Sequence, residues 1–302
     1  EMTTKRRHTD ECRRARLLFI CREDAELSVK LGEEEERTFS FVGGEEVRQI
    51  VIENANIASL EMKVISGAAG FTALGAEFDD VKGVAVDNLS VRSNNGQAMF
   101  WSNAAVNAQI NSMRPYDLVV LQYGLNIMQA DRHNYSLYGE QVEKMVQYVQ
   151  SCFPTAAVLV MGVSDRSQKN ESGIVPMTAA KDLSKWQRTA AENCQVAFWD
   201  TYAAMQQLGG METFVANGWA GKDYTHINYA GGARIARELY YALLKGAEEY
   251  CASLRERIER TQPLLQKPLE LDAVNKIEIA EIEVEDITES ATDAADTEEE
   301  IL

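Results

Sequence analysis

The sequence is short of the residues from which metal sites and disulfide frameworks are built. Its 302 residues include five cysteines and three histidines. The cysteines are odd in number and widely scattered, with no Cys-x-x-Cys pair, so they predict neither a disulfide framework nor a zinc site of the usual spacing. The histidines form no His-x-x-x-His pattern. Metal catalysis is therefore a distant hypothesis, and we expect no metal or other cofactor.

Long apolar runs and basic stripes are also missing. No run reaches the roughly 18–20 apolar residues that a membrane helix needs. No basic stretch is interleaved with aromatic residues, as nucleic-acid-binding proteins would require. The run Arg16-Leu-Leu-Phe-Ile-Cys21 follows basic residues but is too short for the core of a signal peptide. The sequence thus predicts neither a membrane span nor a nucleic-acid partner, and it leaves the oligomeric state open.

Acidic residues outnumber basic ones, 47 to 30, and the excess is concentrated at the C-terminal end. Residues 270–302 carry a net charge of −12, which leaves −5 of the total of −17 for the rest of the chain. The 45% of hydrophobic residues is ordinary for a globular protein with a sizeable core. We predict a mildly acidic folded body and a disordered acidic tail at 263–302. Within that tail, the strand-like stretch 276–285 could instead pair with the edge of a partner's sheet.

The first part of the chain alternates apolar and polar residues over short stretches, as half-buried β-strands do. Such stretches lie at residues 26–31, 37–41, 47–52, 60–65 and 71–74, and turn-forming residues separate them. They contain no recognisable chemistry. We predict a flexible basic segment at 1–15 and an all-β accessory region, a sheet or half-sandwich, at 16–80.

From Gly83 onward the pattern changes to short, almost continuous apolar runs, typical of parallel strands buried on both faces. These runs lie at residues 84–86, 117–122, 157–161 and 196–199. Helical periodicity is found at about residues 97–113, 138–152, 178–193 and 229–244, and from about 246 to near 261, before Pro263 and Pro268. Strands that alternate with helices predict an α/β domain at 81–262 with a doubly wound, flavodoxin-like parallel sheet.

Polar residues gather where such a sheet binds its ligands, beyond the carboxyl ends of the strands. They lie at residues 87–94, 123–126, 162–166 and 200–201. Separately, Asp223-Tyr-Thr-His226 lies on a loop that leads into a helix. A carboxylate so close to a histidine can fix its tautomer and stabilise the imidazolium, as a general base requires. The plainer alternative is a histidine that braces the start of the helix.

In combination, these blocks resemble the SGNH (GDSL-like) hydrolase superfamily, and more narrowly its secreted bacterial members with a β-rich insert. Asp223 and His226, followed by Asn228-Tyr-Ala-Gly-Gly232, resemble the block that supplies the acid and the histidine. Gln122-Tyr-Gly124-Leu-Asn126 resembles the block whose asparagine side chain donates to the oxyanion. Residues 87–96 resemble the block in which a glycine N–H completes the oxyanion hole, and Ser93 stands at that glycine's position. The resemblance covers about residues 15–246.

The resemblance implies acyl transfer, in which a serine attacks an ester carbonyl, His226 accepts and returns the proton, and Asp223 orients His226. It implies that the substrate is a small-molecule or glycan ester, and it favours an O-acetylated carbohydrate or cell-wall glycan. It also favours a periplasmic or extracellular location. Gly124, Arg92 and Arg166 are candidate substrate contacts. The two arginines could hold a substrate carboxylate, although structural ion pairs are their commoner use.

The Gly-Asp-Ser block that carries the nucleophile in this superfamily is absent from the sequence. Our first interpretation is that the chain begins inside the insert and lacks both the nucleophile and the central strand, which would leave two sheet edges unpaired. Substitute nucleophiles are less favoured; they are Ser164, Ser90, Ser93 and Cys21. The alternative function is an inactive glycan-binding or scaffold protein that keeps the cleft. His133 is expected at the surface or at the rim of the site, with substrate contact as a minor alternative.

Overall fold

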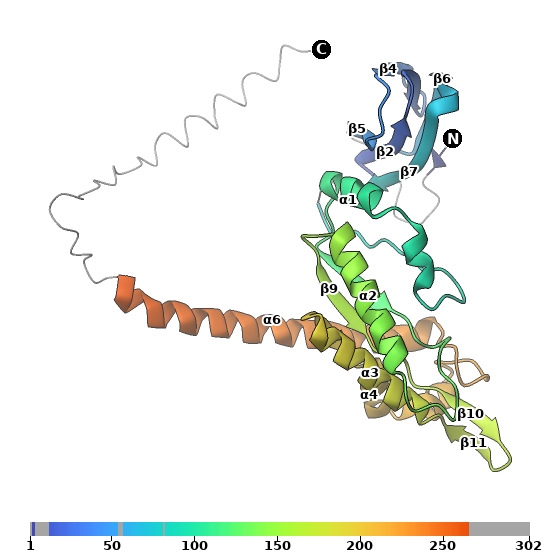
Figure 1. Cartoon of the computed structure of the whole chain (residues 1–302), viewed down its shortest axis with the longest axis vertical. Coiled ribbons are helices and arrows are strands. Elements are labelled where there is room, and N and C mark those ends of the chain that lie inside the picture. The colour runs from blue at the N-terminus through green and yellow to red at the C-terminus, as the bar shows by residue number, and fades with distance from the viewer. Residues whose placement is uncertain (1, 4–11, 54–56, 81, 266–302) are drawn as a thin grey trace. The chain divides into compact units, whose positions relative to one another are not determined.

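The computed structural model describes residues 2–3, 12–53, 57–80 and 82–265 (Figure 1). The chain divides into two compact units, Glu1–Tyr240 and Tyr241–Leu302. The first unit contains the strands and helices that position the candidate site. Most of the acidic tail predicted at 263–302, including its strand-like stretch, lies outside the described residues, as does most of the basic segment predicted at 1–15. The predicted domain boundaries stay predictions.

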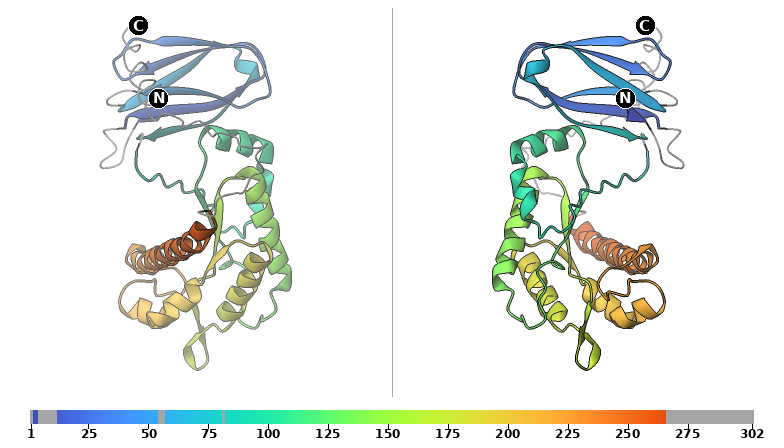
Figure 2. Two further views of the ribbon diagram at one scale, coloured as in Figure 1. Left: turned by 90° about the vertical axis from the view of Figure 1, so that its left-hand side faces the viewer. Right: turned by 90° about the vertical axis from the view of Figure 1, so that its right-hand side faces the viewer.

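The N-terminal strands form two antiparallel sheets in two layers, seen in blue to teal in Figure 2. One sheet has the order β1 (Met2–Thr3), β6 (Ser59–Ser66), β3 (Ala25–Leu31) and β4 (Arg37–Phe41), and the other has the order β5 (Arg48–Glu53), β2 (Arg14–Cys21) and β7 (Phe71–Asp79). Apolar residues from both sheets share one buried core. The all-β region predicted from the alternating pattern is confirmed, and β7 runs further than the pattern indicated.

Strand β2 begins inside the segment predicted to be flexible, and it is the centre of its sheet. Successive side chains of a strand point to opposite faces. One set of alternate residues enters the core between the sheets: Ala15, Leu17, Phe19 and Cys21. On the other face, Leu18 and Ile20 pack against helix α1 (Ala104–Met113). Strand β2 is therefore buried on both faces, because it has a sheet on one side and a helix on the other.

The parallel sheet has the order β12 (Ala197–Trp199), β9 (Ala157–Met161) and β8 (Leu118–Gln122). Helices α2 (Ser136–Cys152) and α3 (Ala179–Asn193) share a core with it, which includes Val142 of α2, Leu183 of α3 and Val160 of β9. The predicted α/β class with a parallel sheet is confirmed. Four further elements follow β9 and β12 that the periodicity did not indicate: the hairpin of β10 (Ser167–Asn170) and β11 (Gly173–Pro176), and helices α4 (Thr201–Gln207) and α5 (Gly210–Ala216).

Two strand predictions are corrected by the structure. Residues 84–86 form no strand, and Val84 is 94% exposed. Strand β8 forms, but it is not buried on both faces, because Leu118 and Val120 are 43% and 44% exposed. The reason is the same in both cases. Apolar runs become buried strands only where other strands and helices cover them, and β8 is an edge strand within the described residues.

Two helix predictions also change. The helix predicted at 97–113 divides into a 3₁₀ turn, η2 (Gln97–Trp101), and α1, since the Asn103 side chain caps α1 by accepting from the N–H groups of Ala105 and Val106. The helices predicted at 229–244 and 246–261 are one helix, α6 (Tyr229–Leu265). It continues past Pro263, which contradicts the predicted break there. Pro268 lies outside the described residues.

Candidate active site

Asp223 and His226 form a hydrogen-bonded pair in the loop that precedes α6. His226 Nδ1 lies 2.6 Å from Asp223 Oδ2. Asp223 Oδ1 accepts hydrogen bonds of 3.0 Å from the backbone N–H groups of Thr225 and His226. Tyr224 adopts a left-handed φ of 55° within this tight turn. The helix begins directly afterwards, because the Asn228 side chain accepts from the N–H groups of Ala230 and Gly231.

The electrostatics of this loop favour an ionised carboxylate. Hydrogen bonds from the His226 backbone N–H, the His226 ring and the Thr225 N–H lower the pKa of Asp223 to about 2. A carboxylate that accepts from Nδ1–H leaves Nε2 as the ring nitrogen that can exchange a proton. The side chains of His226 and Asp223 are 78% and 52% exposed. The pair is therefore formed, and it is open to solvent.

A second hydrogen bond brings together the two segments predicted to build the oxyanion hole. Asn126 Nδ2 donates to the backbone carbonyl of Asn94 at 3.0 Å, although 32 residues separate them. The Asn94 side chain in turn accepts from Gly96 N–H at 2.6 Å. Ser93, which stands where the resemblance places a glycine, has a φ of 58°. This left-handed conformation suits glycine best, and Ser93 adopts it despite its Cβ.

A buried glutamine that the sequence analysis did not single out joins the loops after β8 and β9. Gln187, on α3, is 1% exposed; its Nε2 donates to Tyr123 O and its Oε1 accepts from Val163 N, both at 2.8 Å. Gly124 has a φ of 121°, and a Cβ there would lie 3.0 Å from Gln187 Nε2. The sequence contained one signal that Gln187 is buried: it falls within the apolar stripe of a predicted helix, four residues after Leu183 and four before Ala191.

A backbone hydrogen bond connects the hairpin that follows β9 to the Asp223–His226 loop, because the N–H of Ser167, the first residue of β10, donates to Tyr224 O at 3.1 Å. At the base of the same hairpin, Met177 N–H donates to Arg166 O at 2.8 Å. Asp165 is buried and accepts from the N–H groups of Arg166 and Met211, and burial raises the pKa of its carboxyl group. The chain of contacts Asn94–Asn126, Tyr123–Gln187–Val163 and Ser167–Tyr224 therefore runs along the carboxyl ends of β8 and β9.

The remaining candidate nucleophiles and substrate contacts lie in different parts of the structure. Cys21 is completely buried in the core between the antiparallel sheets, which contradicts its proposed role as a nucleophile. Ser164 follows β9 and is half-buried, whereas Ser90 and Arg92 are exposed in the segment that leads to Ser93. Arg166 is half-buried, and its Nε finds no hydrogen-bond partner among the described residues.

His133 also takes part in a histidine–aspartate pair. Its Nδ1 lies 2.6 Å from Oδ2 of Asp182, in the first turn of α3, and both side chains are substantially exposed. The sequence analysis expected His133 near the surface but did not identify Asp182 as its partner. Because two such pairs have the same Nδ1–Oδ2 distance, a short histidine–aspartate contact does not by itself identify a catalytic base. The neighbouring groups must decide.

Within the described ranges, no group of three or more His, Cys, Asp or Glu side chains is arranged to hold a metal ion. The same part of the chain contains no helix that is both long and apolar enough to cross a membrane.

Comparison with solved structures gives several matches at low sequence identity. A structure described as a peptidoglycan O-acetylesterase matches 80% of this chain and 65% of its own length, with 21% identity and a TM-score of 0.56. A lipase/acylhydrolase from Enterococcus faecalis matches 49% of this chain and 71% of its own length, with 21% identity and a TM-score of 0.35. An acetyl xylan esterase matches 50% of this chain and 77% of its own length, with 16% identity and a TM-score of 0.37.

No protein-family model matches the sequence, and no curated protein does. The chain thus spans slightly less than two thirds of the length of the peptidoglycan O-acetylesterase structure, which it matches with a TM-score above 0.5. At 21% identity this likeness shows a shared fold. It confirms the predicted resemblance at the level of the fold.

Proposed function

We propose that the chain is the larger part of an SGNH-type ester hydrolase that removes acetyl groups from a carbohydrate or cell-wall glycan. The observation that carries this proposal is the Asp223–His226 hydrogen bond of 2.6 Å, in a loop that is bonded through Tyr224 to the start of β10, shortly after β9. The structure of similar fold that is described as a peptidoglycan O-acetylesterase supports the substrate class.

In this proposal His226 Nε2 takes the proton of the attacking hydroxyl and returns it to the leaving alkoxide, while Asp223 holds Nδ1–H and stabilises the imidazolium. Asn126 supplies one oxyanion donor. An amide nitrogen carries two hydrogens, so the bond to Asn94 O fixes the group and leaves the second N–H for the tetrahedral oxyanion. Each such donor lowers the barrier by about 3–4 kcal/mol. The backbone N–H of Ser93 would be the second donor.

The proposal places the nucleophilic serine on polypeptide outside residues 1–302. The exposed apolar side chains of Leu118 and Val120 on edge strand β8, and of Val84 in a run that forms no strand, support this part. A neighbouring strand would pair the open edge, and a helix packed on the same face of the sheet would cover residues of this kind. The high exposure of His226 is consistent with a missing neighbour as well.

The test is hydrolysis of an aryl acetate by this chain and by a version extended with the residues encoded immediately before Glu1. We expect the extended protein to turn over the ester and this chain to be at least about 10³-fold slower, because a triad without its nucleophile loses most of its effect. If the extended protein is as inactive as this chain, the esterase proposal is wrong.

The extended protein also allows a matched comparison of the two histidine–aspartate pairs. His226→Ala should abolish most of the turnover, whereas His133→Ala, which breaks a pair of the same length, should retain it. Asn126→Ala should lower kcat by about 10²–10³-fold. Equal losses in the two histidine variants would contradict the assignment of His226 as the base.

The second candidate is a glycan-binding or scaffold protein without catalysis, favoured by the absence of a Gly-Asp-Ser block from the sequence. It predicts that O-acetylated glycan binds to this chain, and that neither His226→Ala nor extension of the chain changes the slow background hydrolysis.

A further inference from the structure

The segment between β7 and η2, residues 82–96, carries Ser93 and is held at its two ends. Residues 88–93 lie between these attachments and are exposed throughout. Leu89 and Val91 extend apolar side chains into solvent, so packing of these side chains does not set the path of the segment. Its position must depend on the two attachments.

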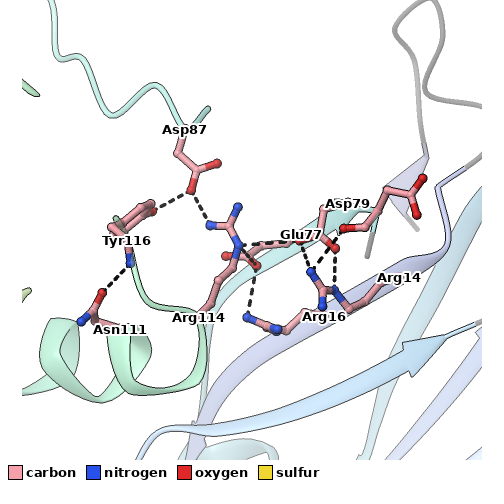
Figure 3. Close-up of polar contacts among 9 residues, drawn as sticks. Arg14, Arg16, Glu77, Asp79, Asp87, Asn111, Arg114 and Tyr116 are labelled. Carbon is pink, nitrogen blue, oxygen red and sulfur yellow. Dashed lines mark hydrogen bonds and ion pairs between the residues drawn. The ribbon is translucent and has the colours of Figure 1, made fainter. Parts of the chain in front are cut away.

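The first attachment is Asp87. Its Oδ2 accepts hydrogen bonds from Arg114 Nη1 at 2.6 Å and from the Tyr116 hydroxyl at 2.7 Å, as Figure 3 shows. The bond from Arg114, together with that from Tyr116, lowers the pKa of Asp87. The pKa of Tyr116 is raised to about 12, chiefly by burial and then by its bond to Asp87. Asp87 is therefore an ionised acceptor fixed by two donors.

Arg114 is itself fixed by the antiparallel sheets. Its Nε lies 3.3 Å from Glu77 and 3.7 Å from Asp79, both on β7 (Figure 3). Asp79 is also held by Arg14 of β2 through two hydrogen bonds of 2.7 and 2.9 Å. Arg114 thus connects two carboxylates of the sheet with the carboxylate that begins the Ser93 segment. The contacts of Arg114 with Glu77 and Asp79 are ion pairs, whereas its bond to Asp87 is a charge-assisted hydrogen bond, which is stronger than a neutral one.

The backbone of Arg114 is fixed as well, because the residue caps the C-terminal end of α1. Helix α1 packs its apolar residues Val106, Ile110 and Met113 against the outer face of β2. The side chain of Gln109 also accepts from Val47 N–H at 2.7 Å. The position of Arg114 therefore follows the position of the antiparallel sheets.

The second attachment lies on the other side of Ser93. Asn94 O accepts from Asn126, and Asn95 O accepts from the Tyr138 hydroxyl at 3.3 Å and from Gln141 Nε2 at 3.4 Å. Tyr138 and Gln141 belong to α2, which packs on the parallel sheet. The Ser93 segment therefore bridges the two sheet regions.

We propose that Arg114 is a positioning residue, which places the Ser93 backbone N–H by holding Asp87 against the antiparallel sheets. The β-rich region then has a role in the site although it supplies no residue to it. The role of the Ser93 N–H as an oxyanion donor rests on the proposed function. The placement of this N–H by Arg114 rests on geometry alone.

The test measures backbone ¹⁵N order parameters of residues 88–93 in this chain. In the unsubstituted protein they should be close to 0.85, the value of rigid backbone, and in Arg114→Met they should fall below about 0.6. The matched control is Arg14→Met, which removes an arginine of the same network that does not contact Asp87. It should leave residues 88–93 rigid. Arg114→Lys, which keeps a charge near Asp87, should restore part of the loss.

Two results would overturn the proposal: mobile residues 88–93 in the unsubstituted chain, or equal order parameters in Arg114→Met and Arg14→Met. In the extended protein, Arg114→Met should lower kcat at least about tenfold with little change in KM, because an oxyanion donor acts mainly in the transition state. If the extended protein has no activity but the order parameters behave as stated, the ester hydrolase proposal fails and the placement by Arg114 holds.

Discussion

Strands β2 and β8 have similar apolar sequences and different surroundings. Strand β2 lies between β5 and β7 and carries α1 on its outer face, and its residues from Ala15 to Cys21 are all buried. Strand β8 pairs with β9 alone within the described chain, and two of its five residues, Leu118 and Val120, are apolar and exposed. The comparison teaches that two apolar runs can both form strands, while the elements around each strand decide how much of it is buried.

The largest effect expected from this comparison lies in β2. Phe19 is buried and meets the rings of Phe41 and Phe71 at centroid distances of 5.0 and 5.2 Å. Phe19→Ala should lower the free energy of unfolding by about 3–5 kcal/mol, because it removes a large side chain from a packed core. Urea denaturation measures this loss. A loss below about 1 kcal/mol would show that the two regions differ less in packing than the structure indicates.

A smaller effect is expected where the parallel sheet region is tied together at its carboxyl edge. Gln187→Leu leaves the N–H of Val163 and the carbonyl of Tyr123 without their partner. We expect a loss of about 2–3 kcal/mol in the free energy of unfolding, since each buried group that loses its partner is costly. The control is Lys185→Leu, at an exposed position of the same helix, which should change the stability by less than about 0.5 kcal/mol.

The Asp223–His226 pair should contribute a still smaller, pH-dependent amount. The folded pKa of Asp223, about 2, lies below its ordinary 3.8, so the pair stabilises the fold above pH 3.8 and this stabilisation is lost as the pH falls toward 2. Both side chains are more than half exposed, so solvent screening limits the amount to about 1 kcal/mol or less.

The measurement is the difference in unfolding free energy between the unsubstituted chain and Asp223→Asn. The difference should be constant above about pH 5 and should shrink at lower pH. A difference that grows as the pH falls would show that the Asp223 carboxylate is not the stabilised form.

The smallest effect is expected at the open edge. Val120→Thr keeps the β-branched shape and removes little buried apolar surface, because Val120 is 44% exposed. The unfolding free energy should therefore change by no more than about 0.5 kcal/mol. The same substitution at Val160 of β9, which is buried, should cost clearly more. In the extended protein, a large effect of Val120→Thr would show that the added polypeptide covers this edge.

Most helices and strands were predictable from the local sequence pattern, but the residues at which they begin and end were not. Strands β3, β4, β5, β6, β8, β9 and β12 and helices α2 and α3 follow the periodicity of their own residues to within a few positions. Strands β1 and β2 lie outside the predicted stretches, and β7 runs on to Asp79 from a stretch predicted to end at residue 74. Residues 84–86 show the failure most clearly. Their sequence is that of a buried strand, and the structure leaves Val84 in solvent because no described strand lies beside it. Whether a stretch finds a neighbouring strand to pair with is decided by the fold, and the stretch itself does not encode it.

The candidate site divides in the same way. The spacing of Asp223 and His226 is local, and a turn of four residues is enough to bring the carboxylate to the ring. Three features depend on segments far apart in the sequence: the Asn126–Asn94 bond, the Gln187 bridge and the hold of Arg114 on Asp87. The His133–Asp182 pair also joins residues that are far apart in the sequence, and their spacing did not predict it.

The sequence by itself determined the alternation of strands and helices, the all-β region before them, and the residue types from which a base, its acid and an oxyanion donor can be built. These follow from side-chain periodicity and from contacts within a few residues. Only the tertiary structure decided which apolar strands are covered, which carbonyl Asn126 binds, and how a salt-bridge network reaches the Ser93 segment. Burial and long-range hydrogen bonds depend on contacts between different elements. The local sequence of one element does not specify which other element will lie beside it in the folded chain.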